Sequence, residues 1–298
     1  MAISSAVAFS IASSAQAQEI EPRAYSNAPI GMNFFIGGYA YTEGGVPFDG
    51  ALPIKKGEIK TSNAVLAYAH VFDLLGQSSK VNVILPYTSL AGTAEFAGRP
   101  QERNIYGYGD LSAKLSVNFS GAPALSLKEF RSYQQDLIIG ASLQITAPTG
   151  QYDSSKLVNL STNRWSFKPE IGFSKAAGNW TGELQAGATL FTDNTDFFGG
   201  NTRKQAPIYS LQGHAIYSFT AGIWGSLDAT YFTGGRTTIN GSENSDLQQN
   251  WRLGGTLAFP VDAKNSVKLY ASSGVSARTD NNYNLFGIAW QYRWGGGL

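Results

Sequence analysis

The sequence predicts an all-β protein, a transmembrane antiparallel up-and-down β-barrel of about twelve strands of the outer-membrane type. The first observation behind this prediction is the strict alternation of residues 283–294. One face carries Phe286, Ile288, Trp290, Tyr292 and Trp294, and the other carries Leu285, Gly287, Ala289, Gln291 and Arg293. A period of two is typical of a β-strand. An aromatic face suits a strand whose outer side meets lipid tails and whose ends lie in aromatic girdles.

Composition is the second observation. Charged residues make up only 14% of the chain, against about 25% in soluble domains, yet the mean hydropathy is −0.15. Alternating strands produce this combination, because each apolar outward residue is offset by a small or polar inward residue. No stretch of the chain body has the ~20 consecutive apolar residues that a transmembrane helix requires.

The third observation is that further segments alternate in the same way, each near the ~9 to 11 residues that cross a bilayer at a tilt. These segments are 33–41, 61–72, 80–90, 106–119, 136–147, 163–174, 180–191, 208–219, 223–232, 250–259 and 266–277. Short turns follow the second, sixth, eighth and tenth segments, and long polar loops follow the first, third, fifth, seventh and ninth. Short turns lie on the periplasmic side of bacterial barrels, so both termini are expected there.

One connection, 121–134, is long where a short turn is expected. It contains Leu125, Leu127, Lys128, Glu129 and Phe130 after a proline, which predicts a short periplasmic helix.

The N-terminal residues 1–17 are apolar and small, and they end in Ala15-Gln16-Ala17, which resembles a signal peptidase site. A positive region before the apolar stretch is missing, so we expect either a start further upstream or a chain that begins inside the signal. Cleavage after Ala17 would leave a periplasmic N-terminal segment, 18–31, followed by an outer-membrane barrel, 32–298. Such a barrel has outer-membrane lipid and the assembly machinery for outer-membrane barrels as partners.

Several classes of function are disfavoured. The net charge of +1 lacks the basic excess of a nucleic-acid-binding protein. There are no cysteines, only two histidines, and none of the common phosphate-binding or hydrolase motifs, so no cofactor and no metal is expected. Four acidic residues of the outer loops could bind calcium, but solvent-exposed carboxylates are the simpler interpretation. They are Asp193, Asp196, Glu243 and Asp246.

Charged and polar residues at inward positions are the candidate functional residues. They are Asp110, Lys114, Arg164, Lys168, Glu170, Glu183, His214, Asp228, Arg252, Lys268 and Arg293. They could define a solute path, or they could be a mixed-charge ladder that neutralises itself across strands. The expected lipid-facing girdle comprises Trp165, Phe167, Trp290, Tyr292 and Trp294.

His214 is the residue on which an enzymatic function would depend. A tight turn at 220–222 that is symmetric about residue 221 sets His214 opposite Asp228. Ser226 then lies one inward step away, and a diagonal spacing of roughly 7 to 8 Å exceeds hydrogen-bond reach. The pattern predicts a cross-strand polar pair and no catalytic triad.

Four segments carry a family resemblance: 106–118 (YGYGDLSAKLSVN), 121–135 (GAPALSLKEFRSYQQ), 147–153 (APTGQYD) and 157–173 (LVNLSTNRWSFKPEIGF). From about Pro29 onward the chain resembles the outer-membrane protein family associated with the meta-cleavage pathway of phenol degradation. The resemblance implies an outer-membrane barrel and a transporter, and it supplies no catalytic residues. Function is expected to be passive uptake of small solutes, with aromatic or hydrophobic ones as candidates. A lipid or lipopolysaccharide hydrolase and a purely structural barrel remain as alternatives.

Overall fold

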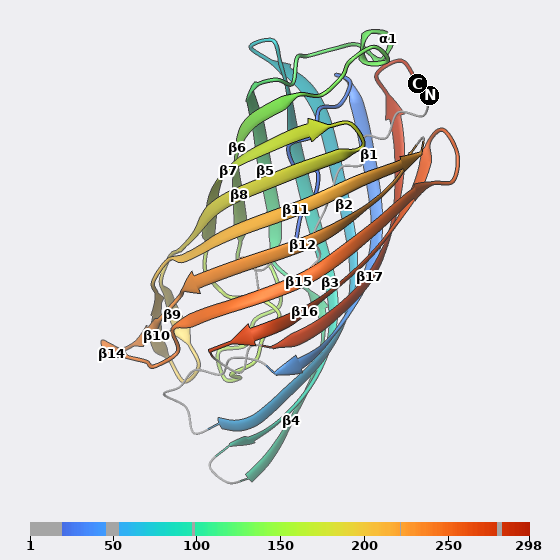
Figure 1. Ribbon diagram of the computed structural model, residues 1–298. Helices are drawn as coiled ribbons and strands as arrows, with labels where there is room; N and C mark the ends of the chain where they lie inside the picture. Colours follow the sequence, from blue (N-terminus) through green and yellow to red (C-terminus); the bar gives the residue numbers. More distant parts are fainter. Residues whose placement is uncertain (1–19, 46–53, 97–98, 221, 279–281) are drawn as a thin grey trace.

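The computed structural model describes residues 20–45, 54–96, 99–220, 222–278 and 282–298, and the expected signal peptide lies outside them. The described residues form an antiparallel β-barrel that closes by pairing between its first and last strands, as predicted (Figure 1). Its strands are β1 (Met32–Gly45), β2 (Ile54–Leu74), β3 (Gln77–Phe96), β4 (Arg99–Tyr108), β5 (Leu111–Ser120), β6 (Leu137–Ala147), β7 (Ser166–Ala177), β8 (Trp180–Phe191), β11 (Ile208–Thr220), β12 (Ile223–Gly234), β15 (Gln248–Pro260), β16 (Asn265–Ala277) and β17 (Tyr283–Gly295). Both β4 and β5 pair with β3 and form two halves of one strand, so the barrel has twelve strands.

The break between β4 and β5 divides a segment that was expected to be continuous. The Asp110 carboxylate accepts hydrogen bonds from the backbone N–H groups of Gly150 and Thr162, each at 3.0 Å. Both donors belong to the loop between β6 and β7. A β-carbon on Gly150 would lie 2.6 Å from the carbonyl carbon of Gly109, so only glycine allows this loop to approach the break.

Residues that were expected to be loops lengthen two barrel strands and form four additional short strands. Both β2 and β3 extend well beyond the predicted 61–72 and 80–90. At the same end of the molecule, a small second sheet is built from β9 (Asn194–Phe197), β10 (Asn201–Gln205), β13 (Thr237–Ile239) and β14 (Ser242–Glu243). We call this the long-loop end.

The opposite end carries the short turns, the C-terminus and the helix α1 (Leu127–Phe130), which confirms the helix predicted there (Figure 1). Ser126 caps the helix, because its hydroxyl accepts the Glu129 N–H while the Glu129 carboxylate accepts the Ser126 N–H at 2.9 Å. Short turns face the periplasm in bacterial barrels, so we call this the periplasmic end.

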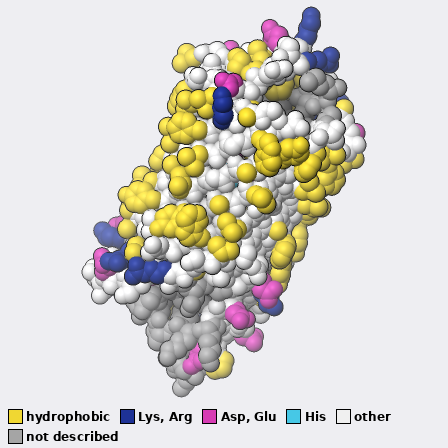
Figure 2. Space-filling view, viewed as in Figure 1, with side chains coloured by type: hydrophobic (Ala, Val, Ile, Leu, Met, Phe, Trp, Pro, Cys, Tyr) yellow, Lys and Arg dark blue, Asp and Glu magenta, His cyan; other side chains and the backbone are white. Residues whose placement is uncertain are grey.

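The outer surface has the apolar band that a lipid-facing barrel needs. Figure 2 shows hydrophobic side chains over the wall of the barrel and charged side chains gathered toward its ends. Trp165 and Trp290 are 46% and 43% exposed, and Phe167 is half-buried. The ring of Trp294 stacks on that of Tyr292, with centroids 5.6 Å apart. None of the helices among the described residues is long and apolar enough to cross a membrane.

One part of the inner wall is apolar, although polar side chains line most of it. Phe34 and Ile36 of β1 point inward and pack with Ala67 and Ala69 of β2, all fully or almost fully buried. The glycines of β1 obscured this orientation in the sequence, where either face could have been the outer one.

Candidate functional site

The candidate site is the interior of the barrel, where the inward positions of β5, β6, β7 and β8 carry charged and polar side chains. Lys114, Lys168, Glu170 and Glu183 are each about 5% exposed. Alternation along each strand puts them on the same face as the small inward residues. Burying so many charges is costly unless each one meets a partner of opposite charge.

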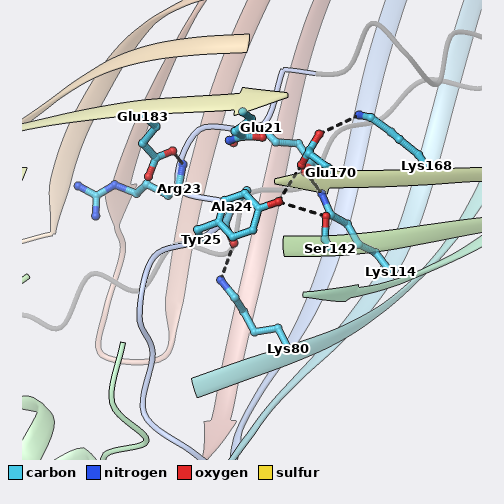
Figure 3. A network of polar contacts seen from close by, with 11 residues as sticks. Glu21, Arg23, Ala24, Tyr25, Lys80, Lys114, Ser142, Lys168, Glu170 and Glu183 are labelled. Atoms are coloured by element: carbon cyan, nitrogen blue, oxygen red, sulfur yellow. Dashed lines mark hydrogen bonds and ion pairs between the residues drawn. The ribbon is translucent and has the colours of Figure 1, made fainter. Parts of the chain in front are cut away.

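The N-terminal segment, here residues 20–31, supplies many of these partners because it lies inside the barrel (Figure 3). It belongs to no barrel strand, yet Glu21 and Tyr25 are 5% and 1% exposed. The sequence predicted a periplasmic segment at 18–31, and the described part of it, 20–31, lies in the lumen. We call residues 20–31 the plug.

Glu21 and Tyr25 connect the plug to a buried ionic cluster on the barrel wall. Nζ of Lys114 lies 2.5 Å from Oε2 of Glu21 and 3.6 Å from Oε1 of Glu170. Glu170 also contacts Nζ of Lys168 at 3.3 Å and accepts a hydrogen bond from the Tyr25 hydroxyl at 3.2 Å. Two lysines therefore neutralise two glutamates, and one of these glutamates comes from the plug.

Arg23 makes a second connection. Its backbone N–H donates to Oε2 of Glu183 at 2.6 Å, and its guanidinium donates to Ser218 at 3.1 Å. The same guanidinium lies over the ring of Trp224, 4.8 Å from the centroid. Glu183 is also held by the hydroxyl of Ser174 at 2.8 Å, so its position is set on both sides.

Wall side chains also satisfy the backbone carbonyl groups of the plug. Lys80 of β3 donates to the carbonyl oxygens of Ala24 and Ser26 at 2.9 and 3.0 Å (Figure 3). Gln185 donates to the carbonyl oxygen of Glu21 at 3.0 Å. A buried segment without sheet pairing needs such partners, because an unpaired buried carbonyl costs about as much as a lost hydrogen bond.

Two glycines of the wall make room for the Tyr25 ring. A β-carbon on Gly172 of β7 would lie 2.0 Å from the ring, and one on Gly140 of β6 would lie 2.6 Å from it. Both distances are far below any possible contact. The wall is therefore shaped to fit this side chain.

The plug contacts were missed from the sequence. Lys80 was the easiest of these contact residues to predict from the sequence. It alternates with the outward Val81 and Val83, so its side chain had to point inward. Glu21, Arg23 and Tyr25 lie in a stretch with no periodicity, so no sequence signal indicated that they enter the barrel.

Other candidate residues lie away from the ionic cluster. Asp110 holds the break between β4 and β5, and Arg293 donates to the carbonyl oxygen of Ala263 in the turn after β15 at 2.8 Å. The guanidinium carbon of Arg252 lies 3.8 Å from the centroid of the Tyr283 ring, and Nζ of Lys268 lies 5.4 Å from the centroid of the Tyr270 ring. A role in a solute path remains a prediction for all of them.

His214 and Asp228 are directly opposite each other on β11 and β12, in the register that the tight turn predicted. Nδ1 of His214 lies 2.8 Å from Oδ1 of Asp228. Ser226 donates to Oδ2 of the same carboxylate at 3.0 Å. The serine contacts the acid and not the imidazole, so the order of a Ser–His–Asp triad is missing.

The side chains of three of the four acidic loop residues have protein partners, and Asp196 takes part through its backbone, whose carbonyl oxygen accepts from the Tyr152 hydroxyl at 2.9 Å. Asp193 pairs with Lys204 at 3.0 Å, Glu243 with Arg236 at 2.6 Å, and Asp246 accepts the backbone N–H of Thr237 at 2.9 Å. Within the described ranges, no group of three or more potential ligand residues could hold a metal ion.

Comparison with solved structures shows the same fold. The COG4313 outer membrane channel from Pseudomonas putida F1 is 19% identical, with a TM-score of 0.78 over 93% of this chain and 100% of that one. The transport unit of the Escherichia coli autotransporter AIDA-I is more distant, at 8% identity and a TM-score of 0.51 over 89% of this chain and 90% of that one. No curated protein matches the chain. A family model described as "Putative MetA-pathway of phenol degradation" matches residues 37–292. The chain therefore belongs to that family.

Proposed function

We propose that this chain forms an outer-membrane channel for the passive uptake of small solutes, and that the plug narrows its lumen at rest. A membrane barrel with a polar, charged interior fits such a function, because it offers water and ions a path that lipid does not. Outer-membrane lipid and the assembly machinery for outer-membrane barrels are the partners that this function requires.

The attachment of the plug is the observation that carries the proposal. Residues 20–31 have no place in the strands of the barrel and are held in it largely by side-chain contacts. Backbone hydrogen bonds from Ile30 to Leu125 and from Gly31 to Val71 join only the end of the segment next to β1 to its surroundings. The segment can therefore move without breaking any strand pairing, which a strand of the wall could not do. A closed barrel with a separable plug is the architecture of a gated pore.

The similarity to a solved outer-membrane channel supports the same function. Small aromatic or hydrophobic solutes are the candidates, because the lumen has an apolar side beside its charged one. Phe34 and Ile36 contribute that apolar side, on the wall formed by β1 and β2.

A hydrolase is the second candidate, and the polar group around His214 argues against it. Ser226 has no hydrogen bond to the imidazole, and His214, Ser226 and Asp228 are each less than 10% exposed. A lipid hydrolase would need its nucleophile accessible to lipid, whereas these side chains point away from it. We therefore assign no enzymatic activity to the chain.

Liposome swelling with refolded full-length protein tests the proposal. We expect small sugars and aromatic alcohols to enter protein-containing liposomes faster than protein-free ones, with a steep loss of rate as solute size rises. Impermeable liposomes that contain correctly folded barrel, together with an absence of conductance in planar bilayers, would overturn the channel function.

A further inference from the structure

Arg164, which precedes β7 at the long-loop end, is a buried cation with an unusual environment. It is 5% exposed, and its guanidinium lies over the ring of Phe191, 4.3 Å from the centroid. Its Nη2 donates to the side-chain amide oxygen of Gln205 on β10. Its Nε and Nη1 have no hydrogen-bond partner. A buried guanidinium is ordinarily paired with a carboxylate or a phosphate.

The acidic residues near Arg164 are already engaged elsewhere. Asp110 accepts hydrogen bonds from Gly150 and Thr162, and Asp193 pairs with Lys204 at 3.0 Å. In the part of the chain that the structure describes, no carboxylate forms an ion pair with Arg164. Its direct contacts are therefore a neutral amide oxygen and an aromatic face, and Asp193 and Asp110 act on its charge only from beyond ion-pair distance.

A second guanidinium adds to the positive charge at this place. Arg203 lies two residues before Gln205 on β10, so both side chains are on one face of that strand. The positive charge of Arg203 repels that of Arg164. The Arg203 guanidinium lies over the ring of Phe197, 5.3 Å from the centroid. Asn163 also donates to the side-chain oxygen of Asn194 at 3.1 Å, which fastens the segment before β7 to the small sheet.

We propose that these side chains, the entrance cluster of Arg164, Arg203, Gln205 and Phe191, bind the carboxylate of a small organic anion. The carboxylate takes the position on Arg164 that the Gln205 amide oxygen now holds. A carboxylate brings a full opposite charge and two oxygens, so it can accept from Nη2 and from the unpartnered Nη1 at once. A neutral amide has one acceptor oxygen and no charge, so a carboxylate outcompetes it for the guanidinium. The assignment of organic anions as solutes rests on the proposed channel function, whereas binding of the anion does not.

Benzoate and benzamide are matched probes for this site, since they share a ring and differ in charge. We expect benzoate, and not benzamide, to block the ion current of the wild-type channel in planar bilayers. Replacing Arg164 by Gln should raise the half-blocking benzoate concentration by about tenfold or more, the loss expected for one charge-assisted hydrogen bond.

Gln205→Glu is the more decisive variant. The glutamate side chain has the same length as glutamine, and its own carboxylate would occupy the position on Arg164 that we assign to the bound anion. It should abolish the benzoate block while leaving the fold intact. Arg131→Gln, at an exposed arginine of the periplasmic end, is the control and should behave as wild type.

Two results would overturn the entrance cluster as an anion site: an equal block by benzamide, or an unchanged benzoate block in Gln205→Glu. If the wild-type protein conducts no current, the channel function fails and the site is tested by thermal unfolding. Benzoate should then raise the Tm of the wild-type protein and not that of Gln205→Glu. Equal shifts in both proteins, or no shift in either, would refute the site.

Discussion

The hydroxyl group of Tyr25 donates a hydrogen bond to Oε1 of Glu170 at 3.2 Å, across 145 residues of sequence. This bond joins the plug to the barrel wall inside a cluster whose charges are buried. Because each buried charge depends on its partner, the stability of the wall and the position of the plug are coupled.

Lys114 is the centre of that cluster, and Lys114→Met should destabilise the barrel. The substitution leaves Glu21 and Glu170 with reduced compensation, and breaking a buried pair costs about 3–5 kcal/mol. Denaturant unfolding in phospholipid vesicles, followed by tryptophan fluorescence, measures this loss. Lys175→Met is the matched control, because Lys175 pairs with Asp136 at the surface and its removal should change little. Equal effects of the two variants would show that the buried cluster adds no stability.

The aromatic face of β17 should be required for assembly. Replacing Trp290, Tyr292 and Trp294 together by Ser removes stacked rings from the lipid-facing side of the closing strand. We expect loss of the heat-modifiable band that folded barrels show on unboiled denaturing gels. Gln291→Ser, on the inward face of the same strand, should retain that band. Equal loss in both variants would mean that the orientation of β17 is wrong.

His214→Asn should leave folding and solute passage close to normal. Asparagine can still donate to Asp228, so the cross-strand pair survives in part. Phospholipase and deacylase assays on purified wild-type protein and on the variant test the enzymatic alternative. A lipid hydrolase activity that disappears with this substitution would contradict the assignment of no enzymatic function.

The capping of α1 should depend on pH. Hydrogen bonds from the Ser126 hydroxyl and backbone lower the pKa of Glu129 below its ordinary value. A carboxylate whose folded pKa is depressed stabilises the helix above its unfolded pKa, and this stabilisation is lost as the pH falls through the lowered folded value. Hydrogen exchange of 126–133, corrected for the intrinsic rate, should therefore accelerate in acid. Glu129→Gln should remove that pH dependence, and an unchanged profile would contradict the capping role.

The barrel was predictable because its signal is local. Inward and outward residues alternate within each strand, so each strand can be recognised from its own sequence. The tight turn between β11 and β12 set the register that pairs His214 with Asp228. The break at Asp110 was not predictable, since it depends on a loop that begins about 40 residues later. The small sheet at the long-loop end likewise forms between segments that have no strong alternation of their own.

The plug escaped prediction for a related reason. Residues 20–31 have no period, and their contacts are distant in sequence, such as the pair of Glu21 and Lys114 at a separation of 93 residues. Only the wall carried a hint, because inward charges on β5, β7 and β8 required partners that the neighbouring strands did not fully supply. The glycines at 140 and 172 gain their meaning only once the Tyr25 ring is seen against them.

The most direct test of the plug as a gate is the single-channel conductance of Gly172→Leu. A side chain at this position occupies the place of the Tyr25 ring, so it should displace the plug and raise the conductance well above that of the wild-type protein. Gly182→Leu is the control, because a β-carbon on Gly182 meets nothing within 4 Å and the variant should conduct as wild type. If Gly172→Leu folds and its conductance equals that of the wild-type protein and of Gly182→Leu, the plug does not narrow the lumen.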